Sequence, residues 1–222
     1  MANGKPDLSG LWEMDPKLRL PAAVGEGDAV SPEFIDIGLV VPGGLPYQPW
    51  AAALVKKRTA ELRVNDPTSY GLPLGVVRML AFPTPRKIIQ VPGQLVILSE
   101  YNSNYRQIFT DGRPLLTDPN PSFNGYSTGK WEGDVLVVQS NGFRDGIWLD
   151  GMGNPLTEAA KITERYHRLN FGHLDIAITV DDPKAYTKPW TITLKQTIRL
   201  DTDLLDYFVN ENEKDLQHFA PK

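Results

Sequence analysis

The chain of 222 residues contains no cysteine and only three histidines. The lack of cysteine excludes disulfides, cysteine nucleophiles, thiolate zinc sites and iron–sulfur clusters. The histidines, at positions 167, 173 and 218, do not have the i, i+4 spacing that binds a metal on a helix. DPNPSFNG, residues 118–125, offers oxygen ligands but lacks the glycine at position six and the distal glutamate of a calcium loop. We therefore expect no metal and no cofactor.

Other features are also missing. No apolar run approaches the roughly 18 residues that a membrane span needs, and MANGKPDLSG lacks the apolar core of an export signal. No Gly-rich nucleotide fingerprint, P-loop or GxSxG serine motif occurs. The formal net charge of −4 argues against nucleic acid or an anionic membrane as a partner. We expect a cytoplasmic protein, or a periplasmic or secreted one if a signal peptide was removed.

From position 82 onward, short runs rich in β-branched and aromatic residues alternate with turn sequences. The runs are KIIQV, QLVILSEY, YRQIFT, GYSTGKW, DVLVVQS, KITERYHRL, HLDIAITV, WTITLKQTIRL and LLDYFV. Asp111-Gly112 has the composition of a hairpin turn, and Glu132-Gly133-Asp134 plays a similar part. Roughly nine sequential strands joined by tight turns predict a mainly β, antiparallel meander, which protects its edges best by closing into a barrel.

The first 80 residues have a different pattern. LSGLWEM could supply an early strand with Trp12 at one end of the barrel, and the Pro- and Gly-rich segment 15–48 is predicted to wrap the outside. PWAAALVKKRTAELRV, which begins at Pro49, is the best helix in the chain. We expect one domain over 1–222, with an arm and helix at 1–80, the barrel at 81–210 and a solvated tail at 211–222.

The join EYNSNYRQIF, residues 100–109, carries many hydrogen-bonding side chains between two predicted strands. Both faces change there from apolar to polar, which inside a barrel marks the mouth or floor of a ligand cavity. The residues expected to bind substrate, with a tyrosine to orient or protonate an oxygen, are Tyr101, Asn102, Tyr105, Arg106 and Phe109. The alternative is a hairpin corner with an ordinary Glu100–Arg106 pair.

Strand alternation also gathers titratable groups. His173 and Asp175 share one face of a strand, and Glu164 shares a face with Tyr166 on the strand before it. His173 is a natural proton shuttle, and a carboxylate neighbour would raise its pKa. Two interpretations stay open: acid–base catalysis by Glu164 or His173 with Asp175 beside the substrate, or a solvated outer face of the barrel.

The connection from Asn141 to Lys161 is about twenty residues long, which in a compact β domain is typical of a lid or binding loop. Two carboxylates in a low-dielectric pocket can split their pKa values, so that one stays protonated as an acid. Asp145 or Asp150 is therefore a candidate acid, and Trp148 would form an apolar wall. Alternatively, Trp148 caps the barrel end and both aspartates make turn hydrogen bonds.

Several motifs resemble those of a large family of bacterial proteins of unassigned function. They include KPDLSGLW, YNSNYRQIFTDGRPL, GYSTGKWEGDVLVV, ITERYHRLNFGHLDI and DDPKAYTKPW, and they cover nearly the whole chain in the same order. Members of that family usually carry an export signal and cysteines near the positions of Gly71 and Val209. This chain has neither, which favours a cytoplasmic role. The LSGLW opening before a β-meander is also similar to lipocalins at the level of fold.

Without cysteine, nucleotide motifs or metal ligands, the remaining catalytic groups are Asp, Glu, His and Tyr. They suit proton transfer, dehydration or ring opening. We therefore predict a cofactor-independent lyase or isomerase that uses acid–base catalysis on a small, largely apolar substrate such as a terpenoid, epoxide or aromatic compound. The alternative is a non-enzymatic, lipocalin-like binding protein. The expected partner is a small hydrophobic molecule. The sequence leaves open whether the chain forms a homodimer.

Overall fold

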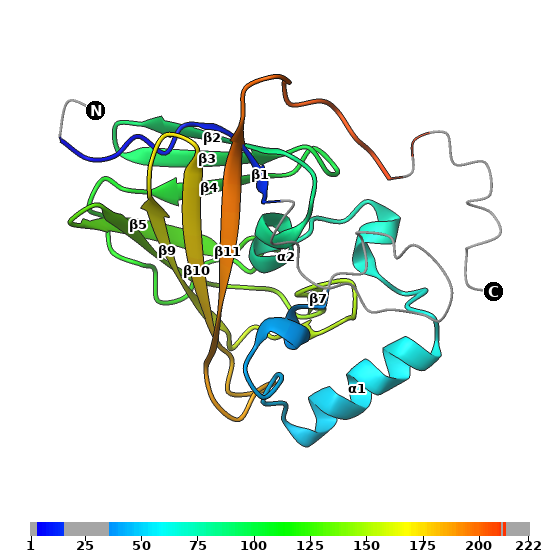
Figure 1. Ribbon diagram of the computed structural model, residues 1–222. Helices are drawn as coiled ribbons and strands as arrows, with labels where there is room; N and C mark the ends of the chain where they lie inside the picture. Colours follow the sequence, from blue (N-terminus) through cyan, green and yellow to red (C-terminus); the bar gives the residue numbers. More distant parts are fainter. Residues whose placement is uncertain (1–3, 16–35, 210, 212–222) are drawn as a thin grey trace.

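Strands with one buried face dominate the chain, and they close into a nine-stranded barrel in the order β1-β11-β10-β9-β6-β5-β4-β3-β2 (Figure 1). The computed structural model describes residues 4–15, 36–209 and 211. The barrel strands are β1 (Gly10–Met14), β2 (Arg86–Val91), β3 (Gln94–Ser99), β4 (Tyr105–Phe109), β5 (Tyr126–Glu132), β6 (Val135–Asn141), β9 (Lys161–Arg168), β10 (His173–Asp181) and β11 (Trp190–Arg199). The predicted mainly β barrel is confirmed.

Alternating side chains position the core. In β10, the side chains of Leu174, Ile176, Ile178 and Val180 are buried, whereas their neighbours on the other face are partly or fully exposed. Since successive strand residues point to opposite faces, the same rule brings every second residue of β9 and β11 into the barrel. The first 80 residues also contribute to this core, because β1 pairs with both β2 and β11 and closes the barrel.

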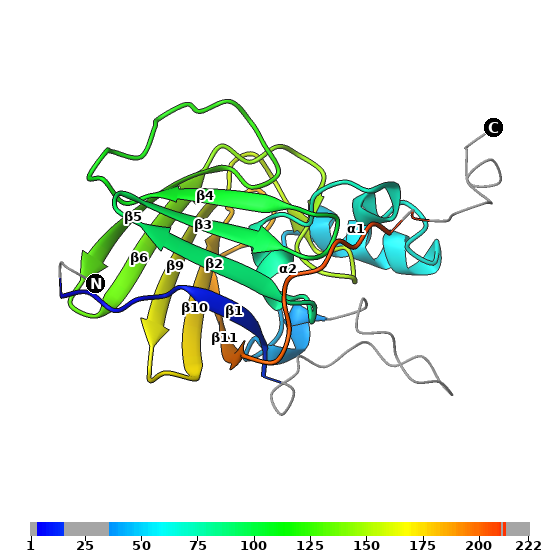
Figure 2. The same cartoon turned by 90° about the horizontal axis from the view of Figure 1, so that it is seen from above.

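One pair of neighbouring strands breaks the antiparallel pattern. β4 and β5 run parallel and share a single register pair, Phe109 with Thr128. The hairpin predicted at Asp111-Gly112 is therefore wrong: parallel strands need a longer crossover, and residues 110–125 arch away from the barrel wall (Figure 2). The turn at Glu132-Gly133-Asp134 does join antiparallel neighbours, β5 and β6.

Within the described part of the chain, two α-helices accompany the barrel. The predicted helix is α1 (Pro49–Ala60), which lies outside the barrel in Figure 1 and has Pro49 at its first position. It ends before the predicted Val64, because Leu62 and Arg63 adopt positive φ angles of 53° and 58°. The second helix, α2 (Val76–Ala81), was not predicted, since six largely apolar residues have no distinguishing periodicity. Two short 3-10 helices span Ile37–Val40 and Pro67–Tyr70.

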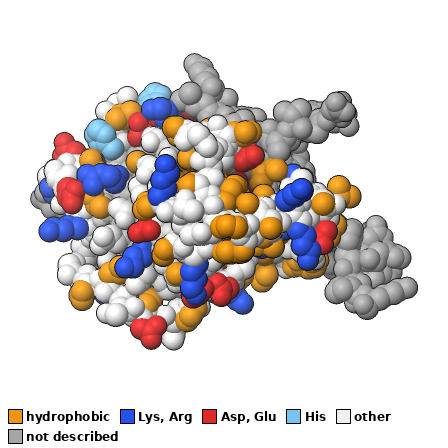
Figure 3. All heavy atoms as spheres, turned by 90° about the horizontal axis from the view of Figure 1, so that it is seen from below, with side chains coloured by type: hydrophobic (Ala, Val, Ile, Leu, Met, Phe, Trp, Pro, Cys, Tyr) orange, Lys and Arg blue, Asp and Glu red, His pale blue; other side chains and the backbone are white. Residues whose placement is uncertain are grey.

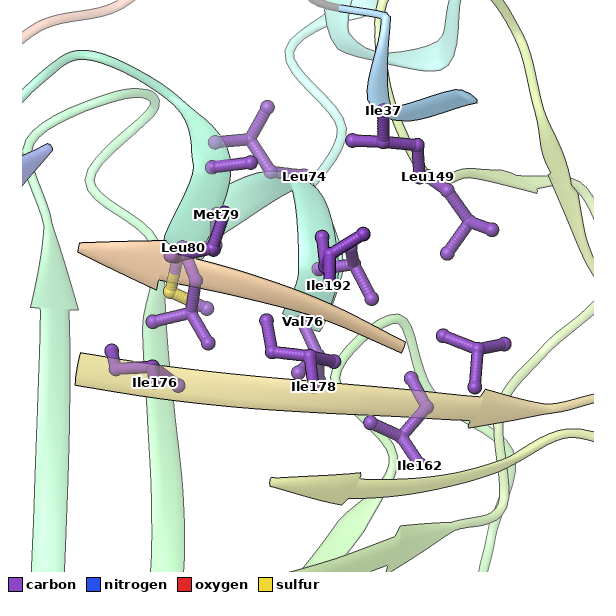
Figure 4. Close-up of a cluster of buried hydrophobic side chains, with 14 of the residues drawn as sticks. Ile37, Leu74, Val76, Met79, Leu80, Leu149, Ile162, Ile176, Ile178 and Ile192 are labelled. Carbon is purple, nitrogen blue, oxygen red and sulfur yellow. The ribbon is translucent and has the colours of Figure 1, made fainter. Parts of the chain in front are cut away.

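Helix α2 fills one end of the barrel. All six of its residues are buried, and Val76, Met79 and Leu80 lie near strand residues such as Ile178 (Figure 4). The buried Arg86 guanidinium donates to the carbonyls of Met79, Leu80, Phe82 and Thr84, which satisfies groups at the C-terminal end of this helix. Burial lowers the pKa of Arg86 to about 10. A side chain from the barrel wall therefore holds α2 in place.

The predicted lid has regular structure. Within the 141–161 connection, β7 (Ile147–Trp148) and β8 (Pro155–Leu156) form a two-stranded sheet. The side chains of Ile147, Trp148, Leu149 and Leu156 are buried. Part of the connection predicted as a lid or binding loop is therefore a packed hairpin, because these apolar side chains gain more from packing than from exposure to water.

The predicted strand LLDYFV, residues 204–209, is also wrong. Both edges of the sheet are already paired when β1 closes the barrel, so no edge is left for it. The segment instead crosses the surface as a strap (residues 201–209) and contacts the barrel through a bridge between Tyr207 and Tyr101.

The predicted arm at 15–48 lies outside the described residues over 16–35, and so does the predicted tail apart from residue 211.

Candidate ligand-binding site

A single register pair, Phe109 with Thr128, joins β4 to β5 in the barrel wall. Two grooves flank this seam. One groove, of about 350 Å³, is lined by residues 104–107 and 109, by residues 122–127, and by Pro73. We call it the seam pocket. The other, of about 520 Å³, lies beyond the Phe109–Thr128 pair and is lined mainly by residues 110–115 and 128–132. Such volumes are within the range of small-molecule sites.

Two residues that line the seam pocket, Arg106 and Ser127, also belong to a charged cluster inside the barrel. Arg106 points inward from β4, and its two terminal nitrogens donate to the Glu164 carboxylate of β9 at 2.8 and 2.5 Å. One of them also donates to the hydroxyls of Ser127 and Ser140, at 3.1 and 2.9 Å. The Tyr166 hydroxyl donates to the same carboxylate at 2.7 Å. The five side chains form the inner cluster.

Burial makes the charges of the inner cluster interdependent. Glu164 and Tyr166 are fully buried, and Arg106 is 2% exposed. Burial alone would lower the pKa of Arg106, but the adjacent Glu164 carboxylate outweighs burial and raises it. Burial, and secondly the charge of Glu164, raises the pKa of the Tyr166 hydroxyl well above its usual value. The cluster therefore holds a charged guanidinium and a neutral phenol around one carboxylate.

Aromatic side chains form the walls of the seam pocket. Phe109 and Tyr126 pack with their ring centroids 5.5 Å apart, and the guanidinium of Arg113 lies 3.9 Å from the Phe109 ring centre. Phe123 also lines the pocket, and Tyr105 does so with 62% of its surface exposed. Such walls suit an apolar or aromatic ligand, with polar groups kept for the inner end.

Asn104 and Asn124 form an amide pair at the same pocket. The Asn124 Nδ2 group donates to the Tyr105 carbonyl at 2.8 Å and to Asn104 Oδ1 at 3.2 Å. Asn104 Nδ2, Asn124 Oδ1 and Arg106 Nε are buried and have no hydrogen-bond partner among the described residues. Buried polar atoms without partners are uncommon in proteins, and three of them belong to this one pocket.

Four of the predicted site residues come together here. Tyr105, Arg106 and Phe109 line the seam pocket, and Glu164 lies behind Arg106 in the inner cluster. The prediction placed these residues at the mouth or floor of a cavity inside the barrel, whereas the groove that they line lies at the barrel wall, where Tyr105 and Gln107 are exposed. The alternative Glu100–Arg106 pair is wrong, because Arg106 binds Glu164 and Glu100 accepts from the backbone of Leu205.

The predicted acids of the long connection lie elsewhere. Asp150 is buried in the β7–β8 hairpin and accepts four hydrogen bonds, from the backbone of Ile37, Met152 and Asn154 and from the Asn154 side chain. Burial raises its pKa to about 6. Asp145 is exposed; its pKa is raised chiefly by a hydrogen bond shared with Glu158. These two carboxylates line neither groove, so the structure does not assemble them into the predicted pair.

Trp148 is likewise buried away from the seam pocket. The guanidinium of Arg58, from helix α1, lies 4.4 Å from its ring centre. The Arg58 guanidinium also donates to the carbonyl of Gly153 at 2.5 Å. Trp148 therefore packs between helix α1 and the rest of the hairpin.

The predicted residues of β10 face outward. His173 is exposed and contacts Asn170, and Asp175 pairs with Lys195 of β11 at 3.0 Å. Histidine side chains are visible at the molecular surface in Figure 3. The alternative of a solvated outer face describes these two residues, and the predicted contact with a substrate inside the barrel is not present.

Tyr101 and Asn102 bind the strap instead of the pocket. Tyr101 is buried between Phe82 and Tyr207, with ring centroids 4.5 and 5.3 Å away. The Asn102 backbone donates to Tyr207, and its side chain accepts from the backbone of Val209. Much of the polarity at residues 100–102 therefore serves to attach the strap.

Sequence reasoning missed Ser127, Ser140 and the amide pair. The two serines occupy inward positions of β5 and β6, where a small polar residue in an apolar alternation could have indicated a buried partner. Asn104 stands within the polar join, and Asn124 stands in the segment that was tested only as a calcium loop. Nothing in the sequence places these two side chains 3.2 Å apart across 20 residues.

The comparisons identify no relative: no protein-family model and no curated protein matches the chain. No helix of the described residues is long and apolar enough to cross a membrane. In the same part of the chain, no three Asp, Glu or His side chains are grouped so that they could hold a metal ion.

Proposed function

We propose that the protein binds a small, largely apolar molecule in the seam pocket. The observation that carries this proposal is the junction between the aromatic pocket and the inner cluster, where Arg106 and Ser127 belong to both. Binding sites for small molecules commonly combine apolar walls with a few polar groups at one end. Of the two functions predicted from the sequence, the geometry favours the binding protein, because no carboxylate or histidine of the described residues lines the seam pocket.

Acid–base catalysis is the second candidate, supported by the Tyr166–Glu164–Arg106 arrangement beneath the pocket. A phenol that donates to a buried carboxylate, with a guanidinium on the same carboxylate, can deliver or accept a proton if the ligand reaches it. Tyr105 at the pocket surface could then hold the oxygen of the substrate. The reaction would be a lyase or isomerase step on a terpenoid, epoxide or aromatic compound, and these side chains would require no cofactor.

A steric block tests the binding function. Gln107→Trp places an indole in the seam pocket, and Gln139→Trp makes the same change in the second groove; both glutamines are exposed on strands. A panel of cyclic epoxides, terpenoid alcohols and phenols is titrated by calorimetry and its products are followed by gas chromatography. We expect binding that Gln107→Trp weakens at least tenfold and Gln139→Trp leaves unchanged.

The outcomes separate the two candidates. Binding without conversion supports a binding protein, and conversion that Tyr166→Phe abolishes supports the enzyme. Equal loss of binding in both tryptophan variants, or loss only in Gln139→Trp, would contradict the assignment of the ligand to the seam pocket.

A further inference from the structure

The amide pair gives the seam pocket a chemical preference, and this inference rests on the proposed binding function. We propose that Asn104 is a specificity-determining residue that donates a hydrogen bond to a neutral carbonyl oxygen of the ligand. Three features of the pocket support this role: the orientation of the two amides, the charge balance, and the backbone before Asn104.

The orientation of both amides follows from one backbone group. The Tyr105 carbonyl can only accept, so the Asn124 atom that lies 2.8 Å from it must be Nδ2. The same Nδ2 group then faces Asn104, which must turn its Oδ1 toward it. This leaves Asn104 Nδ2 as a free donor and Asn124 Oδ1 as a free acceptor. Asn104 is only 8% exposed, so its unpartnered donor is costly in the unliganded protein.

The charge balance of the seam pocket favours a neutral ligand. Among the described residues, Arg106 is the one charged residue that lines the pocket, and its charge is already balanced by the Glu164 carboxylate at 2.5 Å. An anionic ligand would have to lose its hydration without gaining a free counter-charge, which is unfavourable. A carbonyl oxygen loses less hydration and needs only the donor that Asn104 offers.

The backbone before Asn104 is held in a strained conformation. Asn102 and Ser103 adopt left-handed φ angles of 53° and 44°, which side-chain-bearing residues rarely do. The strap maintains this turn, because the Asn102 backbone donates to Tyr207 at 2.7 Å and the Asn102 side chain accepts from Val209 at 3.0 Å. Strain of this kind is often found next to functional groups. Asn104 directly follows this turn and lines the pocket.

Three probes of matched shape test the inference: acetophenone, isopropylbenzene and benzoate. Their dissociation constants are measured at neutral pH by NMR titration of the backbone and side-chain amides. We expect acetophenone to bind about fivefold more tightly than isopropylbenzene, as one hydrogen bond implies, and benzoate to bind more weakly than acetophenone. The side-chain amide signal of Asn104 should shift with acetophenone and remain in place with isopropylbenzene.

Substitution of the donor by an acceptor of the same shape is the decisive step. In Asn104→Asp, the ratio of the acetophenone and isopropylbenzene affinities should fall to about one, and perturbation of the same pocket amides by isopropylbenzene reports that the pocket is folded. Asn141→Asp is the matched control, because Asn141 also has an unpartnered oxygen but does not line the pocket. If Asn104→Asp does not fold, Asn104→Ser, which keeps a shorter donor, should retain part of the advantage.

The outcomes distinguish failure of the inference from failure of the binding function. If all three probes bind in the seam pocket with equal affinity, or if acetophenone keeps its advantage in Asn104→Asp, the specificity role is overturned and the binding function stands. If no probe perturbs residues 104–109 or 122–127, both are overturned.

Discussion

The protein buries a carboxylate in two regions, and the two regions use different partners. Inside the barrel, Glu164 is bound by a guanidinium, a phenol and, through Arg106, two serines. In the β7–β8 hairpin, Asp150 is bound by amide groups alone, with no cationic partner among the described residues. A cation stabilises the buried carboxylate in the first region, and amide hydrogen bonds stabilise it in the second. Both replace the water that the carboxylate loses on burial.

The comparison shows that burial does not by itself identify a functional acid. Both carboxylates are about equally inaccessible, yet only Glu164 belongs to a cluster that reaches a pocket. Asp150 has a raised pKa, which is typical of catalytic acids, but its oxygens organise the turn that joins β7 to β8. The position of the partners therefore separates a structural carboxylate from a candidate functional one.

The largest expected effect is the loss of charge balance inside the barrel. In Glu164→Gln, the Arg106 guanidinium stays buried without a counter-charge, so the free energy of unfolding should fall by about 3–5 kcal/mol. Urea denaturation followed by circular dichroism measures this loss. Arg106→Met combined with Glu164→Met should recover part of it, because no buried charge remains. A Glu164→Gln variant as stable as the wild type would show that the ion pair is not buried as described.

A smaller loss is expected in the hairpin. Asp150→Asn exchanges one acceptor oxygen for an NH2 group that faces donors such as the Ile37 backbone or the Asn154 side chain. The free energy of unfolding should fall by about 1–3 kcal/mol, since hydrogen bonds are lost but no buried cation is left without its counter-charge. Urea titration at neutral pH gives the value. A loss larger than that of Glu164→Gln would reverse the order that the comparison predicts.

The pH dependence of stability also differs between the regions. Burial raises the folded-state pKa of Asp150 from 3.8 to about 6, so between these values the folded protein binds more protons than the unfolded chain. The contribution of Asp150 to stability is therefore greatest at low pH and declines as the pH rises toward about 6. Relative to the wild type, Asp150→Asn should lose this decline. Parallel thermal melts across the acidic range would test it, and identical pH profiles would contradict the raised pKa.

The smallest effect is expected for a carboxylate on the outer face. Asp175 pairs with Lys195, but the two side chains keep 25% and 46% of their surface exposed. Asp175→Asn should lower the free energy of unfolding by less than about 1 kcal/mol, because water solvates both groups after the change. The same urea titration measures it. A loss comparable to that of Asp150→Asn would mean that β10 contacts a further element at this face.

Local patterns predicted much of the fold, and long-range contacts account for the rest. Alternation in β9 and β10 correctly grouped Glu164 with Tyr166 on one face and His173 with Asp175 on another, but it did not show which face turns inward. The parallel pairing of β4 with β5 could not be predicted, because a turn sequence such as Asp111-Gly112 does not reveal the direction in which the chain returns. The strap was mistaken for a strand because its apolar residues resemble one.

The candidate site was predicted only in part, for a physical reason. Tyr105, Arg106 and Phe109 are close in sequence and share the pocket, so a local cluster of polar and aromatic residues was enough to indicate them. Glu164 was selected as a catalytic acid, although its partner Arg106 is 58 residues away. Asp145, Asp150 and His173 have the right chemistry, but their positions depend on which strand face turns inward and on how the hairpin packs.

The most direct test of the account is a map of where a ligand binds. A compound that binds from the panel is titrated into isotope-labelled protein, and the backbone amide shifts are followed by two-dimensional NMR. The account predicts perturbations at residues 104–109 and 122–127 and none at the hairpin 147–156. Perturbations confined to the hairpin, or to the groove at 110–115 and 128–132, would contradict it.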